Sequence, residues 1–193
     1  MTPHRAVLAA LSLALIALPL AGSARPDPDS PANKAKAEAP EKTDGKKTDA
    51  KKIEWLAFDA AAERAVKQDK HMIVDIYTTW CGWCRVMERE TYANPEVAAY
   101  LNDNFVLAKV NGESANKLHW DGKELTERQF ARAVGVTGYP ATFFMKPNAE
   151  LLGGVPGYIK SPDFMIYSRY VATRWYEKGK IQEYVDSLRA SSK

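Results

Sequence analysis

Hydrophobic and polar residues follow regular patterns from residue 53 onward, and these patterns predict a succession of helices and strands. Apolar residues recur at helical spacing over residues 55–68, which predicts an amphipathic helix. Nearly continuous apolar runs over residues 72–77 and 105–110 predict strands that are covered on both faces, as in a parallel sheet. Residues 111–125 are polar and rich in turn formers, and they predict a surface insertion after the second strand.

Capping signals mark where further helices begin. Asn94 before Pro95 has the pattern of an N-cap followed by proline at the first helical position. Thr126 and Gln129 have the spacing of a capping box, and Ser161 predicts one more helix start. The residues after Cys81 predict a helix as well. The helices expected in this part of the chain cover residues 82–90, 95–101, 126–134, 161–171 and 181–188.

The C-terminal half supplies two more strands. Residues 141–145 form an apolar run, residues 146–149 predict a turn, and residues 151–155 can return as an antiparallel partner. Strands that alternate with helices and end in an antiparallel return predict an α/β fold. We expect a central mixed sheet of four to five strands flanked by helices, with an extra helix at the C-terminus.

The N-terminal residues differ from the rest in composition. Residues 1–24 have a short polar start, an apolar run and small residues at the end, which is the layout of a secretory signal peptide. Residues 25–52 are rich in Pro, Ala, Lys, Asp and Glu and contain no aromatic residue, so we expect a disordered linker. An uncleaved membrane anchor is the alternative for the first segment. The folded domain is expected over residues 53–193.

Charge and cysteine content narrow the function. The formal net charge of the 193 residues is +3 and no dense basic block occurs, so charge gives little support to binding of nucleic acid or of a membrane surface. The two cysteines, Cys81 and Cys84, lie in the sequence Trp-Cys-Gly-Trp-Cys. A disulfide across so short a loop constrains little of the unfolded chain, and secreted domains braced by disulfides usually have several. The pair therefore predicts redox chemistry.

The position of Cys81 predicts which thiol attacks. It follows a predicted strand and precedes a predicted helix, where unpaired backbone N–H groups and the helix dipole favour a thiolate. The thiolate is the attacking species in disulfide exchange, so we assign Cys81 as the nucleophile. Cys84, one helical turn later, is expected to face inward and to resolve the mixed disulfide.

Other uses of a Cys-x-x-Cys pair fit the sequence less well. A c-type haem site needs histidine after the second cysteine, where this chain has Arg85. A structural zinc site needs four ligands, and only His71 and His119 are left to complete one, at no standard spacing. A copper(I) carrier, or an adaptor with an incidental dithiol, stays open as an alternative. We expect no resident metal and no cofactor.

Several segments resemble the thioredoxin superfamily in order and spacing. Residues 74–85 are similar to its strand and active-site turn, residues 108–111 to the next strand, and residues 136–142 to the loop with a cis-proline. The resemblance covers residues 55–175 and implies a thioredoxin-like fold. Within the superfamily, the chain resembles bacterial periplasmic proteins with a Trp-Cys-Gly-Trp-Cys motif.

The resemblance implies roles for particular residues. Asp75 corresponds to a buried carboxylate that accepts the proton of Cys84, and Lys109 is expected close to it. Pro140 is expected in the cis form opposite the dithiol, where it helps to hold the backbone of a substrate. The other substrate-binding residues implied are Trp80, Gly82, Trp83 and Tyr139.

The function implied is that of an exported thiol–disulfide oxidoreductase that reduces protein disulfides in the periplasm. Such proteins receive electrons from a membrane protein of the DsbD or CcdA kind, and a monomer is the default state. Trp83, Tyr139 and Ala141 depart from the thioredoxin pattern near the dithiol, so the direction of electron flow stays open. A disulfide oxidase or isomerase is the alternative. The sequence leaves undetermined the substrate, the electron donor and the role of residues 111–125.

Overall fold

The computed structural model describes residues 52–191. The expected signal peptide over residues 1–24 lies outside these residues, as does the expected linker over residues 25–52 except for its last residue. In the part of the chain that is described, no helix has the length and apolar character needed to cross a membrane.

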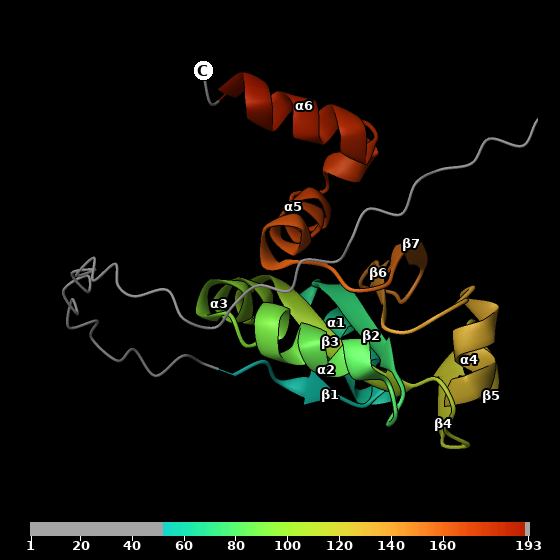
Figure 1. Cartoon of the computed structure of the whole chain (residues 1–193). Coiled ribbons are helices and arrows are strands. Elements are labelled where there is room, and N and C mark those ends of the chain that lie inside the picture. Colours follow the sequence, from blue (N-terminus) through green and yellow to red (C-terminus); the bar gives the residue numbers. More distant parts are fainter. Residues whose placement is uncertain (1–51, 192–193) are drawn as a thin grey trace, which may run out of the picture. The chain divides into compact units, whose positions relative to one another are not determined.

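A mixed sheet of five strands forms the centre of the fold, in the order β1-β3-β2-β6-β7 (Figure 1). β1, β3 and β2 are parallel, whereas β6 and β7 are antiparallel to their neighbours. The predicted α/β fold with a mixed sheet and a C-terminal helix is therefore confirmed. The elements are β1 (Trp55–Leu56), α1 (Phe58–Gln68), β2 (His71–Tyr77), α2 (Gly82–Met87), the π-helical turn η1 (Glu88–Tyr92), α3 (Pro95–Asn104), β3 (Phe105–Asn111), β4 (Lys117–Trp120), β5 (Lys123–Thr126), α4 (Glu127–Ala133), β6 (Ala141–Met145), β7 (Leu151–Pro156), α5 (Ser161–Ala172), the 3-10 turn η2 (Trp175–Glu177) and α6 (Ile181–Ser191).

The two faces of the sheet bury separate sets of apolar side chains. Successive residues of a strand point to opposite faces, so Val74 and Ile76 of β2 join one core cluster and Ile73 joins the other. Asp75 points to the same face as Ile73, together with Lys109, its partner in the β2–β3 register. The cluster on this face also contains residues of α2, α3 and α5. Both polar residues therefore lie at the apolar layer under these helices.

The first helix begins later than its apolar periodicity predicted. Trp55 and Leu56 form the short strand β1, paired in parallel with Leu107 and Ala108 of β3, and the helix starts at Phe58. Backbone pairing with a strand about fifty residues away in sequence overrides the helical periodicity here. The predicted helix after the cysteines is also divided, because α2 continues into η1.

The predicted N-terminal caps differ in outcome. The Asn94 side chain accepts hydrogen bonds from the backbone of Glu96 and Val97, which confirms the expected cap of α3. The helix start predicted at Ser161 is confirmed, but its predicted capping role is wrong, since Lys160 is the N-cap residue of α5 and no side chain caps this helix. The Ser161 hydroxyl donates instead to the carbonyl of Glu90, so it ties α5 to η1.

The insertion over residues 111–125 contains more regular structure than its polar composition predicted. β4 and β5 form an antiparallel hairpin whose turn residues, Asp121 and Gly122, have φ of 52° and 69°. This Asp-Gly turn is a favoured hairpin connection because both residues tolerate positive φ. Leu118 of the hairpin is buried in the core beside α1 and α4.

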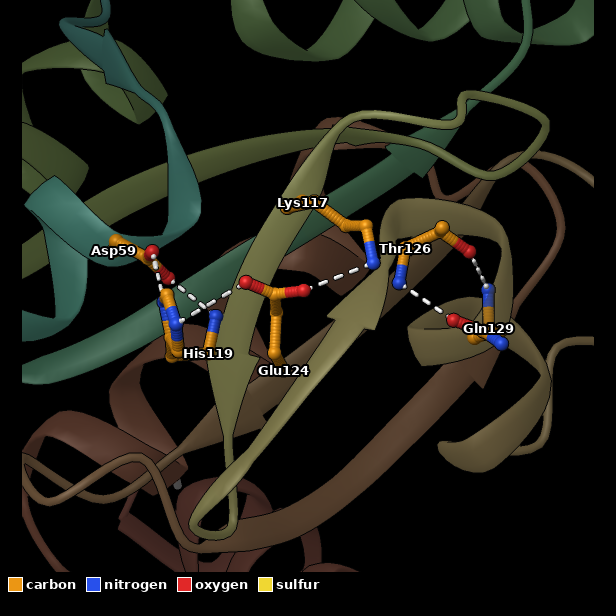
Figure 2. Close-up of polar contacts among 6 residues, drawn as sticks. All are labelled: Asp59, Lys117, His119, Glu124, Thr126 and Gln129. Atoms are coloured by element: carbon orange, nitrogen blue, oxygen red, sulfur yellow. Dashed lines mark hydrogen bonds and ion pairs between the residues drawn. The ribbon is translucent and has the colours of Figure 1, made fainter.

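Polar contacts hold the hairpin to the first helix (Figure 2). Asp59 of α1 accepts the backbone N–H of His119 at 2.8 Å and contacts its Nδ1 at 2.9 Å. Across the hairpin, Lys117 donates to Glu124 at 2.9 Å. Thr126 ends the hairpin and caps α4 through the predicted capping box with Gln129, which is confirmed. The insertion is therefore fixed to the domain at both ends.

Candidate active site

Cys81 and Cys84 lie at the start of α2, shortly after the end of β2, and they form a disulfide in this structure. Cys81 is the N-cap residue of α2, and its Sγ accepts the backbone N–H of Cys84 at 3.0 Å. The Cα atoms of the two cysteines are 5.3 Å apart. The sulfur of Cys81 therefore occupies the donor-rich start of the helix that the sequence predicted for it.

The relative exposure of the two cysteines differs from the prediction. Cys81 is 3% exposed, whereas Cys84 is partly exposed, so Cys84 is not the more buried residue of the pair in the disulfide form. Cys81 lies four residues after the last residue of the buried strand β2, Tyr77, and its N–H donates to the carbonyl of Thr78 at 3.3 Å. Cys84 lies a turn further along α2, away from the strand end.

Two tryptophans flank the disulfide on the surface. Trp80 and Trp83 are 62% and 61% exposed, so neither is packed into the core. Trp80 meets Tyr139 edge to face at 6.0 Å between ring centroids, and Trp83 stacks on Tyr158 at 5.7 Å. Gly82 lies exposed between the tryptophans. These residues place apolar aromatic surface on both sides of the dithiol.

The loop before β6 has the backbone form expected from the resemblance. The Tyr139–Pro140 peptide bond is cis, and Pro140 is buried. The Tyr139 hydroxyl donates to the carbonyl of Gly112 at 3.2 Å, and its ring lies where a Cβ at Gly112 would stand. Trp80 in turn donates from Nε1 to Glu113 at 2.9 Å. The start of the insertion therefore contacts both aromatic residues on this side of the dithiol.

Asp75 and Lys109 come together beneath α2 and η1. Asp75 is 3% exposed, and its carboxylate accepts the hydroxyl hydrogen of Tyr92 at 3.1 Å. The Lys109 Nζ is 3.8 Å from the Asp75 carboxylate but only 2.6 Å from that of Glu88. Burial raises the pKa of Asp75 to about 6, against the opposing effects of Lys109 and the Tyr92 hydrogen bond.

The same lysine contacts two aromatic rings. Its Nζ lies 5.0 Å from the ring centroid of Trp55 and 5.2 Å from that of Tyr77, within cation–π range. Burial raises the pKa of Tyr92 well above its usual range, so its hydroxyl stays protonated and donates to Asp75. A surface groove of about 540 Å³ lies beside this cluster and is lined in part by Trp55, Glu88 and Tyr92.

Sequence reasoning missed Glu88, Tyr92 and Glu113. Glu88 and Tyr92 follow Cys84 by four and eight residues, a spacing that places residues on one helical face and could have drawn attention to them. Glu113 gives no comparable signal, because its contact with Trp80 joins the insertion to the active-site turn.

Not all predicted site residues touch one another. Within residues 52–191, no hydrogen bond joins Asp75, Lys109 or Pro140 to either cysteine. The arrangement consists of the disulfide, the aromatic surface around it, and the buried carboxylate cluster below. The described residues contain no group of three or more His, Cys, Asp or Glu side chains arranged to hold a metal ion.

Comparison with known proteins identifies relatives by sequence. The family model described as Thioredox_DsbH, protein of unknown function, DUF255, matches residues 45–184. An uncharacterized protein of Caenorhabditis elegans is 28% identical over 136 residues, which are 66% of this chain and 18% of the relative. The protein disulfide-isomerase tigA of Aspergillus niger is 36% identical over 109 residues, 55% of this chain and 26% of the relative. The chain thus spans about a fifth to a quarter of the length of these relatives.

Solved structures agree on the fold. A thioredoxin-fold protein from Helicobacter pylori has a TM-score of 0.53 and 19% identity, covering 64% of this chain and 82% of that one. A protein described as DsbH oxidoreductase has a TM-score of 0.52 and 16% identity, covering 70% and 95%. The fold is therefore thioredoxin-like. Since the family model covers most of the chain, the protein belongs to the Thioredox_DsbH (DUF255) family.

Proposed function

We propose that this protein is an exported thiol–disulfide oxidoreductase that reduces protein disulfides through Cys81 and Cys84. The observation that carries the proposal is the Cys81–Cys84 disulfide at the start of α2, with the Cys81 sulfur accepting a backbone N–H. The thioredoxin-like fold and the family support the class of reaction. The direction of electron flow, from this protein to its substrate, is tested by the reduction potential of the Cys81–Cys84 pair.

The reaction begins with the dithiol form. The Cys81 thiolate attacks one sulfur of a substrate disulfide, a Cys81–substrate bond forms, and the other substrate sulfur leaves as a thiolate. Cys84 then loses its proton and attacks the Cys81 sulfur, which releases the second substrate thiolate. The two electrons of the dithiol pass to the substrate, which takes up two protons, and the protein ends as the disulfide seen here.

Asp75 is suited to accept the proton that Cys84 loses. A pKa of about 6 leaves this carboxylate mostly ionised at neutral pH, yet basic enough to take up a proton during the reaction. Tyr92 donates to Asp75, and Lys109 lies 3.8 Å from it, so both groups hold the acceptor in place. Since no direct hydrogen bond joins Asp75 to Cys84, the transfer requires an intervening water or a small movement.

The substrate is an extended polypeptide that lies across the aromatic surface. Its backbone pairs with the loop at Tyr139 and Pro140 in the manner of an added strand. Trp80 and Trp83, both largely exposed, supply apolar contact on either side of the reacting sulfurs. Gly82 adds no side chain of its own beside the two tryptophans, and the Arg85 guanidinium lies 3.9 Å from the position that a Gly82 Cβ would take.

The cellular setting of the proposal rests on the N-terminal sequence. A signal peptide over residues 1–24 would direct the chain to the periplasm, and the linker over residues 25–52 would precede the domain there. Reduction of substrates in an oxidising compartment requires an electron source, for which we propose a membrane protein of the DsbD or CcdA kind. The protein would act as a monomer.

The reduction potential of the Cys81–Cys84 pair tests the direction. We expect a value near that of thioredoxin, about −270 mV, when the purified protein is equilibrated with defined thiol buffers. A value near −120 mV, as in a strong oxidant, would reverse the assignment and make the protein a source of disulfides.

Trapping tests the roles of the two cysteines. A Cys84→Ser variant should accumulate mixed disulfides through Cys81, because the resolving thiol is absent. The matched Cys81→Ser variant should trap little. The opposite pattern would assign the attack to Cys84, the more exposed cysteine of the disulfide form.

A further inference from the structure

A cavity of about 420 Å³ lies beside the cis-proline loop and shares Tyr139 with the site described above. One wall comes from Gly138 and Tyr139 of this loop, and another from Gly112 and Glu113 at the start of the insertion. Helix α4 supplies the third wall. The insertion and the proposed substrate loop thus enclose one hollow.

Two arginines give this cavity its charge. Arg128 and Arg132 of α4 both line it, and residues four apart lie on the same face of a helix. Both are exposed, and in the described part of the chain neither forms an ion pair. Arg128 donates to the carbonyl of Glu113 at 2.6 Å, which fixes its guanidinium against the insertion. Two cationic groups therefore line the hollow, and neither forms an ion pair within the described residues.

Glu113, the acidic residue that lines the cavity, already accepts a hydrogen bond from Trp80. The Glu113 carboxylate accepts the indole N–H of Trp80 at 2.9 Å, a neutral donor. It reduces the positive charge of the cavity but leaves an excess, since two guanidinium groups face one carboxylate.

The cavity lies next to the route proposed for the substrate. Tyr139 lines the cavity, precedes Pro140 and contacts Trp80 edge to face at 6.0 Å. Trp80 directly precedes Cys81. A peptide that pairs with the loop at Tyr139 would therefore carry a residue near its reacting cysteine past the two arginines.

We propose that this cavity is a subsite for an acidic side chain of the substrate, close in sequence to the cysteine that is attacked. The inference rests on the proposed function. Guanidinium groups bind carboxylates through paired N–H···O hydrogen bonds, a geometry that two arginines on one helix face can provide. The insertion over residues 111–125 then has a role in selecting substrates.

Matched peptides test the subsite. Each contains one disulfide and carries Glu, Gln or Lys two residues from the cysteine, in separate series on its N- and C-terminal sides. We expect kcat/KM in one series to be about fivefold higher for Glu than for Gln, and lower again for Lys, as for partly exposed ion pairs. The double variant Arg128→Gln/Arg132→Gln should lose the preference but keep the rate with the Gln peptide. Arg189→Gln on α6, a surface arginine outside the cavity, is the control and should keep the preference.

The outcomes separate the subsite from the reaction. Equal rates for the three peptides in both series, or a preference that survives in the double variant, would overturn the subsite. Absence of turnover with every peptide would count against the reductase instead. In that case, binding of peptides with Ser in place of Cys, followed by tryptophan fluorescence, still decides the subsite. A Glu preference that the double variant loses supports it, and equal affinities overturn it.

Discussion

Glu88→Gln removes the carboxylate that the Lys109 ammonium contacts most closely. In the wild-type protein Lys109 is 2.6 Å from Glu88 and 3.8 Å from Asp75, so Glu88 offsets much of its positive charge. Without that carboxylate, the positive charge acts on Asp75 alone. The ionised form of Asp75 is then favoured, and its pKa should fall below the present value of about 6.

The size of this effect follows from the geometry. A unit charge about 6 Å away contributes about 3 kcal/mol at an effective dielectric constant of 20. Glu88 is 49% exposed, so solvent screening reduces its effect to about 1 kcal/mol. We therefore expect the pKa of Asp75 to fall by about 0.5 to 1 in the variant.

The assay has a direct and a kinetic arm. Carboxyl carbon NMR of the reduced protein reports the pKa of Asp75, and stopped-flow tryptophan fluorescence reports the oxidation of the dithiol by excess substrate between about pH 4.5 and 8.5. Because the carboxylate of the variant stays ionised at lower pH, the acidic limb of the rate profile should move to lower pH. Glu90→Gln in the same turn is the control, since Glu90 contacts Arg89 and Tyr158 rather than Lys109. An Asp75 pKa that stays at about 6 or rises in Glu88→Gln would refute the reasoning.

Two further predictions concern stability. The Asp75 pKa is raised from 3.8 to about 6 on folding, so the folded protein binds more protons than the unfolded one between these values and loses stability as the pH rises through them. Asp75→Asn should abolish this loss and raise the free energy of unfolding at pH 7 by about 2 to 3 kcal/mol, measured by urea denaturation; a lower stability would contradict it. Gly112→Ala should destabilise by about 1 to 3 kcal/mol and raise KM, because the new Cβ meets the Tyr139 ring, whereas Gly153→Ala, with open space around it, should change KM little.

The sheet and most helices could be predicted because their signals are local. The apolar runs of β2 and β3 and the capping box at Thr126 and Gln129 need no knowledge of distant residues. The strand at Trp55 could not be found in this way, since its partner, Leu107, lies far along the chain. The hairpin of the insertion could have been predicted, because Asp121-Gly122 is a readable turn signal.

In the candidate site, too, some residues could be predicted from the sequence and others depend on the folded backbone. The cysteines follow from their spacing, and Asp75 and Lys109 follow from the resemblance, which implied the pairing that the β2–β3 register provides. The contact between Lys109 and Glu88 depends on the backbone of the π-helical turn after α2. No residue pattern in the sequence predicted this turn. The exposure of Cys84 likewise depends on how its helix packs against the rest of the domain.

The two edge strands of the central sheet affect how readily the protein aggregates at high concentration. One edge is β1, only two residues long, and the other is β7, which contains two adjacent glycines, ends at Pro156 and pairs with β6 through an irregular register. Short strands, proline and bulges all make a poor template for strand addition from another copy. Both edges of the central sheet are therefore poor sites for edge-to-edge aggregation of the protein.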